Sequence, residues 1–292
     1  MAAREYRRLE FTVLAAPAVI YVCLFCLAPL ALLFLYSFYR VDFVAIVPEF
    51  NLRNYATVLT SETYLSLIAK AIWHGIAVAF FTAVIGYPLS FFIAMRVKFL
   101  KAALLTALLI PLYTGDLVRI FAWRVVLGAE GILNSFLMWI GATDEPIMAL
   151  LFNTGASLLV LTYNYLPFMV LAVWIALELL DRQLLEASAD LGAGRFRTFR
   201  HVVLPLTLPG VLVGGLMVFA LVVGDYLTPQ LIGGSSGVTV ISAIHDLFGS
   251  AFDWPLGGAI AWTLMGILVL FIAAAATLTL RSRLGRALFR MH

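Results

Sequence analysis

Six stretches of this sequence are long and apolar enough to cross a membrane as helices. An apolar helix needs about 20 residues to span a hydrocarbon layer ~30 Å thick. Of the 292 residues, 63% are hydrophobic and 12% are charged, and the charged share is about half of the roughly 25% usual for a soluble domain. This composition excludes an ordinary soluble enzyme and a nucleic-acid-binding domain driven by charge. We therefore expect an all-α membrane protein with six transmembrane helices, approximately over 12–38, 67–95, 102–123, 147–177, 203–224 and 256–280.

The basic residues predict how these helices are oriented, because Lys and Arg gather in the cytoplasmic loops of membrane proteins. With the N-terminus inside, most of the 19 basic residues fall in inner segments, namely Arg4, Arg7, Arg8, Arg96, Lys98, Lys101, Arg182, Arg195, Arg197, Arg200, Arg281, Arg283, Arg286 and Arg290. The outer segment 225–254 has no Lys or Arg. Both termini are therefore expected in the cytoplasm. We also expect a small surface helix within the outer segment 40–66 and a short interfacial helix over 132–140.

The sequence contains no convincing motif for catalysis, nucleotide binding or metal binding. A phosphate-binding loop of the G-x-x-x-x-G-K-[ST] type needs a lysine directly after a glycine, whereas Lys70, Lys98 and Lys101 follow Ala, Val and Leu. The four histidines lie far apart in the sequence, so a shared metal site is not expected. A G-x-S-x-G match at 233–237 lies in a predicted outer loop, where a glycine-serine turn is favoured over a nucleophile elbow. We expect no enzyme activity, metal or cofactor in this chain.

The inner segment 178–203 is the longest predicted cytoplasmic loop and the least lipid-like part of the chain. Its apolar and small residues recur at helical spacing, and Glu186 and Asp190 fall on the opposite face. Gly192 can take the left-handed conformation that ends a helix, and Pro205 suits the first turn of the next one. The pattern predicts a short helix, a break and a second helix. From the residues alone, the segment is either a solvated connector or a helix that docks into a partner's groove.

The residues of this loop resemble the EAA loop of permease subunits in binding-protein-dependent ABC importers. The shared pattern is Glu186-Ala187-Ser188, then Gly192, then Leu204-Pro205 twelve residues after that glycine. The third position holds Ser188 where the family has alanine, which exchanges one small residue for another. The resemblance implies that this loop is a coupling helix held by a separate ATPase, with Glu186, Ala187, Asp190, Leu191 and Gly192 as the coupling positions.

Four further stretches are similar to spermidine/putrescine-type permeases and place the chain with the PotB-like rather than the PotC-like member of the pair. These stretches are 118–134, 165–169, 224–234 and 253–257. The resemblance covers nearly the whole chain. It implies one transmembrane permease domain over 1–292, of the type I importer kind, with the coupling loop at 178–203.

This resemblance also implies a function, partners and a location. The chain would form a path for uptake of a small cationic solute, a polyamine such as spermidine or putrescine, in the bacterial inner membrane. Its partners would be a cytoplasmic ABC ATPase dimer that binds ATP and Mg, a second homologous permease subunit, a periplasmic substrate-binding protein and the lipid bilayer, with no nucleic acid. The alternatives are an importer of an opine, a phosphonate or another organic solute, and a secondary transporter driven by an ion gradient.

Polar residues at membrane depth are costly and therefore suggest function. If 102–123 is one helix, Tyr113, Asp116 and Trp123 share a face, where a carboxylate and aromatic rings suit a cationic amine. Alternatively, Asp116 pairs with Arg119 one turn away and only fixes the helix.

Two further places contribute candidates for the translocation path. Pro167 can kink the fourth helix close to a polar pair, and Asp225 lies near the outer end of the fifth. Asp225 either meets a cation delivered from outside or caps the turn before Pro229. The candidate path residues are Tyr113, Asp116, Arg119, Trp123, Asn164, Tyr165, Asp225 and Tyr226.

Overall fold

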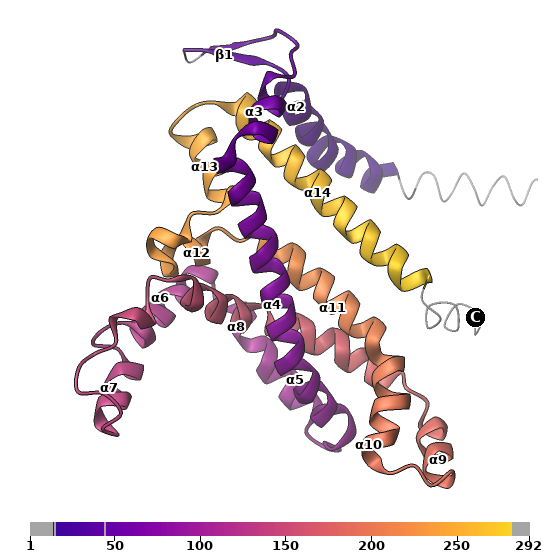
Figure 1. The fold of residues 1–292 in the computed structure, drawn as a ribbon. Coiled ribbons are helices and arrows are strands. Elements are labelled where there is room, and N and C mark those ends of the chain that lie inside the picture. The colour runs from indigo at the N-terminus through magenta and orange to yellow at the C-terminus, as the bar shows by residue number, and fades with distance from the viewer. Residues whose placement is uncertain (1–13, 15, 44, 282–292) are drawn as a thin grey trace, which may run out of the picture. The chain divides into compact units, whose positions relative to one another are not determined.

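The structure, a computed structural model, describes residues 14, 16–43 and 45–281 and is mainly helical (Figure 1). Within this described part, six helices are long and apolar enough to cross a membrane. They are Ala16–Tyr36, Glu62–Met95, Asp116–Trp139, Thr154–Glu178, Arg195–Gly224 and Trp254–Ala274. The expected fold class, an all-α membrane protein with six such helices, is confirmed. Part of the predicted orientation rests on residues outside the described ones, namely Arg4, Arg7, Arg8, Arg283, Arg286 and Arg290.

The third predicted helix is not continuous, so the prediction of one helix over 102–123 is wrong. Helix α5 (Lys101–Leu109) passes into a 3-10 turn (Ile110–Tyr113), and α6 (Asp116–Leu127) begins after an extended Thr114 and Gly115. Pro111 in the 3-10 turn has no amide hydrogen to continue the helical pattern. The break moves the third candidate span to α6 and α7 (Ile132–Trp139).

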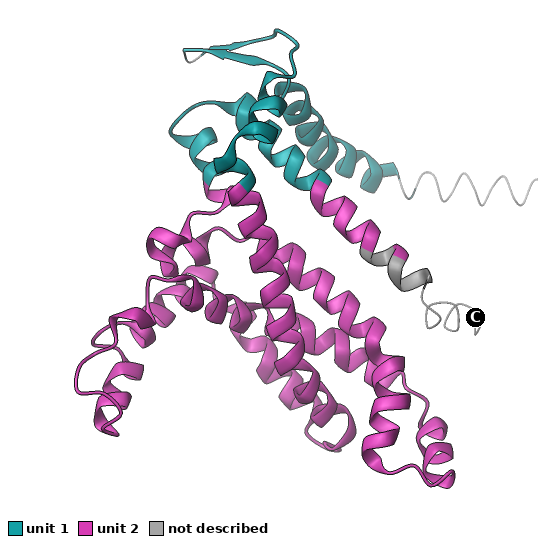
Figure 2. Ribbon diagram, in the orientation of Figure 1, with its two compact units in different colours: residues 1–65, 243–266 teal, residues 66–242, 267–292 magenta. Residues whose placement is uncertain are grey.

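The chain divides into two compact units (Figure 2). Unit 1 comprises residues 1–65 and 243–266. Its described part includes a π-helical turn (Val22–Leu27), α2 (Ala28–Tyr36), strands β1 (Arg40–Asp42) and β2 (Ala45–Val47), and α3 (Arg53–Thr60). Helix α3 confirms the small helix expected within 40–66. The antiparallel hairpin, with Arg40 opposite Val47, was not expected.

A few polar and aromatic contacts hold unit 1 together. The hydroxyls of Ser37 and Tyr55 lie 2.7 Å apart, and the amide nitrogen of Asn54 donates to the carbonyl oxygens of Ser37 and Tyr39 at 2.9 Å. These bonds fasten α3 to the end of α2. The ring of Phe34 packs edge-on against Trp262 at 4.8 Å.

Unit 2 comprises residues 66–242 and 267–292. It contains most of the remaining elements, among them α5, α6 and α7. The others are most of α4 (Glu62–Met95), α8 (Thr154–Glu178), α9 (Arg182–Asp190), α10 (Arg195–Thr198), a π-helical turn (Phe199–Val203), α11 (Leu204–Gly224), α12 (Leu227–Ile232), and 3-10 turns at Met148–Leu150 and Gly234–Gly237. Helices α13 (Val240–Gly249) and α14 (Trp254–Arg281) are shared between the two units, since residues 243–266 belong to unit 1. Helix α7 confirms the short helix predicted over 132–140.

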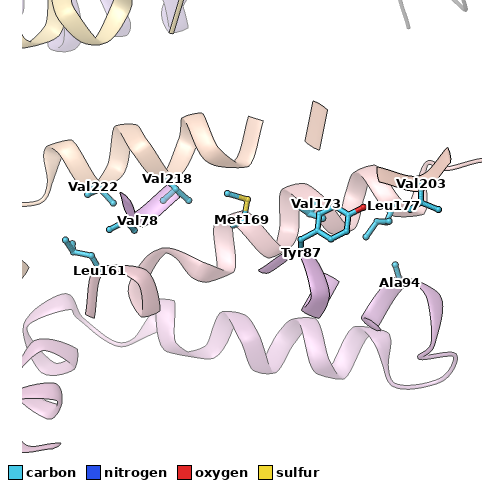
Figure 3. Close-up of a cluster of buried hydrophobic side chains, with 10 residues drawn as sticks. All are labelled: Val78, Tyr87, Ala94, Leu161, Met169, Val173, Leu177, Val203, Val218 and Val222. Carbon is cyan, nitrogen blue, oxygen red and sulfur yellow. The ribbon is translucent and has the colours of Figure 1, made fainter. Parts of the chain in front are cut away.

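The core of unit 2 lies where α4, α8 and α11 pack along one another (Figure 3). It consists of Val78, Tyr87 and Ala94 from α4, Leu161, Met169, Val173 and Leu177 from α8, and Val203, Val218 and Val222 from the π-helical turn and α11. In lipid, such close packing supplies the contacts that hold helices together. Tyr87 also places its hydroxyl 2.8 Å from that of Thr207, which ties α4 to α11.

Two glycines bring α11 against α8. A Cβ atom on Gly210 would lie 2.5 Å from Cβ of Ala176, and one on Gly214 would lie 2.9 Å from the sulfur of Met169. Only glycine allows this approach, so Gly210-x-x-x-Gly214 marks a tight helix crossing, as its sequence suggests.

Candidate functional site

The break before α6 places Asp116 at the start of a helix. Gly115 precedes it with extended geometry, φ −56° and ψ 145°. A carboxylate is stabilised here because the unpaired amides of the first turn carry partial positive charge. Asp116 also forms an ion pair with Arg119, three residues on. Its side chain is 67% exposed and that of Arg119 only 11%, so the pair presents its acidic member outward.

Arg119 connects α6 to α8. Its Nη1 donates to Oδ1 of the buried Asn164 at 3.3 Å. The buried Nε of Arg119 has no hydrogen-bond partner among the described residues. A guanidinium has five N–H donors in a fixed plane, and this one therefore retains a donor that no described residue engages.

Tyr165, the next residue of α8, connects this helix to the turn after α11. Its hydroxyl donates to Oδ2 of Asp225 at 3.1 Å. Asp225 follows the last residue of α11, and its two oxygens accept from the amide and hydroxyl of Thr228 at 3.1 and 2.7 Å. These bonds show Asp225 as the cap of the turn into α12, one of its two predicted roles. Contact with a cation stays a prediction.

Five of the predicted path residues thus form a polar network, the network of α6, α8 and the α11–α12 turn. It consists of two hydrogen-bonded groups, Asp116–Arg119–Asn164 and Tyr165–Asp225, which meet where Asn164 and Tyr165 are consecutive residues of α8. Thr228, the second residue of α12, belongs to it through its bonds to Asp225. It was missed, since a threonine in a predicted outer segment carries no distinguishing sequence signal. The predicted alternative in which Asp116 pairs with Arg119 is realised in the structure. The pair leaves the Asp116 carboxylate accessible, so it does not exclude a role in the path.

The other three predicted path residues are Tyr113, Trp123 and Tyr226. Tyr113 is 89% exposed and lies in the 3-10 turn before the break, so the expected helical face shared by Tyr113, Asp116 and Trp123 is wrong. Trp123 packs edge-on against Tyr163 at 5.3 Å, and both line an apolar cavity of about 550 Å³ with residues of α4 and α8. Tyr226 is half-buried at the start of α12.

The segment 178–203 forms the predicted helix, break and second helix. The carboxylate of Asp181 accepts from the amide of Gln183 at 2.9 Å and so caps α9. Gly192 has φ +76°, and the amide of Ala193 donates to the carbonyl of Ser188 at 3.1 Å. This is the glycine-terminated helix end in which a left-handed residue lets the chain turn back and satisfy the last carbonyls.

Helix α9 stands out from the rest of unit 2 as an exposed surface. The predicted coupling positions are all exposed, namely Glu186, Ala187, Asp190, Leu191 and Gly192. Two of these positions, Ala187 and Leu191, also line a groove of about 720 Å³, together with Leu184, Ser188 and His201. The hydroxyls of Ser188 and Thr198 lie 2.9 Å apart, so α9 is fastened to α10 while its acidic face stays open to a partner.

A family model described as the binding-protein-dependent transport system inner membrane component matches residues 86–286. The chain is 34% identical over 232 residues to the spermidine/putrescine transport system permease protein PotB of Salmonella typhimurium (strain SL1344), covering 78% of this chain and 80% of that protein. It is also 34% identical to PotB of Escherichia coli (strain K12), covering 78% and 84%. The inner membrane ABC transporter permease protein YdcU of the same strain is 31% identical over 254 residues, covering 82% and 79%.

Solved structures share the fold at low sequence identity. A chain of a bacterial ABC transporter involved in the import of the acidic polysaccharide alginate superposes with a TM-score of 0.78 at 14% identity, covering 96% of this chain and 99% of that one. The same transporter in complex with a periplasmic protein bound to alginate pentasaccharide gives 0.76. These likenesses concern the fold alone.

Proposed function

The chain belongs to the family of binding-protein-dependent transport system inner membrane components and is a multi-pass permease subunit of an ABC importer, and we propose that its solute is a small cation of the polyamine class, spermidine or putrescine. The observation that carries the solute class is the 34% identity to spermidine/putrescine permeases over 232 residues. That similarity extends over about four-fifths of both chains, which makes a shared solute class the simplest proposal.

The polar network suits such a solute. Asp116 offers an exposed carboxylate, and its partner Arg119 is largely buried. An ammonium group that approaches from the open side meets the carboxylate first, and opposite charges attract strongly where water is scarce. The proposed path therefore runs past Asp116, with Arg119, Asn164, Tyr165 and Asp225 holding its wall in place. Tyr113, Trp123 and Tyr226 are proposed to contribute aromatic surface.

We further propose that α9 couples this path to ATP hydrolysis. ATP and Mg would bind to a separate dimer of ATPase subunits, and α9 would dock into it through Glu186, Ala187, Asp190, Leu191 and Gly192. The exposure of these five residues supports the proposal, as does the glycine-terminated end that keeps α9 short. ATPase closure would then shift the helices as rigid bodies.

The rest of the assembly follows from the same proposal. A second homologous permease subunit would complete the path, and a periplasmic binding protein would deliver the solute. Residues 1–292 would act as one transmembrane domain, with 178–203 as its coupling loop. Both termini, and α9, would lie in the cytoplasm of a bacterium, since most Lys and Arg residues fall on that side.

The test is to purify the chain from its native membrane with its bound subunits and to reconstitute the complex in vesicles. We expect an ATPase subunit and a second permease to co-purify. Uptake of labelled putrescine or spermidine should require ATP and the loaded binding protein. Uptake driven by an ion gradient without ATP would contradict the importer, and ATP-dependent uptake of an opine or a phosphonate in place of polyamines would contradict the solute class.

A further inference from the structure

Lys70 is a charged residue within an otherwise apolar helix. Helix α4 contains only one other charged residue, Glu62, at its first position, and Lys70 lies two turns further on. It is half-buried in unit 2. A charged side chain at this depth is costly unless it is paired or hydrogen-bonded. The partners of its ammonium group therefore indicate why a lysine is present.

These partners are two backbone carbonyls far away in the sequence. The Nζ atom of Lys70 donates to the carbonyl oxygen of Val238 at 2.8 Å and also to that of Ser236. A lysine ammonium has three donors and no acceptor, and two of the three are thus engaged by one short loop. Hydrogen bonds from a charged donor are roughly twice as strong as neutral ones.

The loop that receives Lys70 is well ordered by its own contacts. The hydroxyl of Ser236 donates to the carbonyl of Gly233 at 2.8 Å. Thr239 and Ser242 exchange hydrogen bonds, with the amide of Thr239 donating to the Ser242 hydroxyl at 2.9 Å and the amide of Ser242 donating to the Thr239 hydroxyl at 3.2 Å. Thr239 is 4% exposed. The loop thus presents two neighbouring carbonyls in a defined position.

We propose that the carbonyl oxygens of Ser236 and Val238 form a binding site for a primary ammonium group, which Lys70 fills, and that this contact fastens the loop 233–239 to α4. The loop follows α12, which Asp225 caps, so Lys70 holds the far end of the segment that begins in the polar network. A polyamine ends in the same chemical group. If Lys70 left these carbonyls, they would fit the ammonium end of the proposed solute. Only this fit to the solute rests on the proposed function.

The experiment measures whether the loop opens when the ammonium is removed. The two cysteines of the chain, Cys23 and Cys26, are replaced by serine. A single cysteine is then introduced as Thr239→Cys, next to the Val238 carbonyl. Its reaction rate with a membrane-impermeant thiol reagent is compared between Lys70 and Lys70→Ala in the assembled complex. Ser235→Cys, at an exposed position of the same loop, is the matched control.

We expect the buried cysteine at 239 to react about ten-fold faster or more in Lys70→Ala, because two charge-assisted hydrogen bonds are lost. The rate at 235 should not change. Propylammonium, which replaces the deleted side chain and its donors, should slow the reaction at 239 again. Tetramethylammonium, which has the charge but no N–H group, should not.

Two results would overturn the proposal. Equal rates at 239 with and without Lys70 would show that the ammonium does not hold the loop. Equal effects of the two amines, or no effect of either, would show that the carbonyls do not select a primary ammonium. If Lys70→Ala fails to assemble, Lys70→Met, which keeps an unbranched apolar side chain, gives the same comparison of rates. Because labelling requires no transport, failure here is distinguishable from failure of the polyamine proposal.

Discussion

Arg119 is the residue on which the polar network depends. It is bonded to Asp116 on its own helix and to Asn164 on α8, so its removal would leave one carboxylate without its ion pair and one buried amide without its donor. The polar side chains of this network could be predicted from the sequence, because charges inside apolar stretches are conspicuous. Their pairing could not, since it depends on the break at Thr114 and Gly115, which turns Asp116 from a mid-helix residue into a helix start.

At this scale, Asp116→Asn should lower uptake of the cationic solute about ten-fold, because the amide keeps the shape but loses the charge that attracts an ammonium. Assembly of the complex should be unaffected. Initial uptake rates in vesicles check this, with Asp144→Asn, an exposed acid in the segment after α7, as control. Unchanged uptake in Asp116→Asn would show that the carboxylate has no role in the path and only pairs with Arg119.

At the scale of elements, α8 and α11 pack closely along one another in unit 2. This packing follows from the small residues Gly210 and Gly214, whose spacing is a close-packing motif of membrane helices. The break in the third span was not predicted, although Pro111 and Gly115 are both visible in the sequence. An apolar stretch of sufficient length masks them, since prolines also occur within α4, α8 and α11 without ending those helices.

The helix crossing gives a matched pair of variants on one helix. Gly210→Ala should lower the free energy of unfolding by about 1–3 kcal/mol, because the new methyl group collides with Ala176 and the backbone of Ala172. Gly215→Ala should be neutral or slightly stabilising, since its nearest neighbour would be the Met169 methyl group at 3.9 Å and alanine favours helices. Thermal unfolding in detergent measures both, and equal melting temperatures would refute the tight crossing.

The coupling role of α9 predicts a separation of two activities. Glu186→Lys reverses a charge on the exposed face, so the complex should still hydrolyse ATP while uptake falls about ten-fold, because basic groups on the ATPase would be repelled. Membrane insertion should be normal. The ratio of solute transported to ATP hydrolysed measures this, with the exposed Glu145→Lys as control for the change of charge. An unaltered ratio would argue against coupling through Glu186.

At the scale of the whole molecule, the family and the number of spans follow from hydrophobic length and from one loop motif. These signals are strong because a membrane allows few backbone arrangements. The antiparallel hairpin of β1 and β2 and the contact of Lys70 with the loop 233–239 could not be predicted. Both depend on segments meeting in space, and a single sequence does not record which carbonyl a lysine reaches.

The orientation of the chain is a prediction at this scale. With both termini in the cytoplasm, a cysteine at Ser235 should react with an impermeant reagent in intact cells whose outer barrier is opened. A cysteine at Phe196, which is 74% exposed, should react only after the inner membrane is permeabilised. Both positions lie in unit 2. The two variants can be labelled in the same type of preparation. The reverse pattern would place the N-terminus outside and α9 out of reach of an ATPase.

The glycine crossing also sets how a displacement at one end of α11 reaches the other. The continuous helical run Arg195–Gly224 has 30 residues, about 45 Å at 1.5 Å per residue. It can therefore tilt as one rigid rod. A tilt of about 5° at α10 would move its far end by about 4 Å, and α8, clamped to it at Gly210 and Gly214, would swing with it. The Tyr165–Asp225 bond, which joins the two clamped helices, would then survive the swing. The Arg119–Asn164 bond, which joins them to α6, would be the one that breaks.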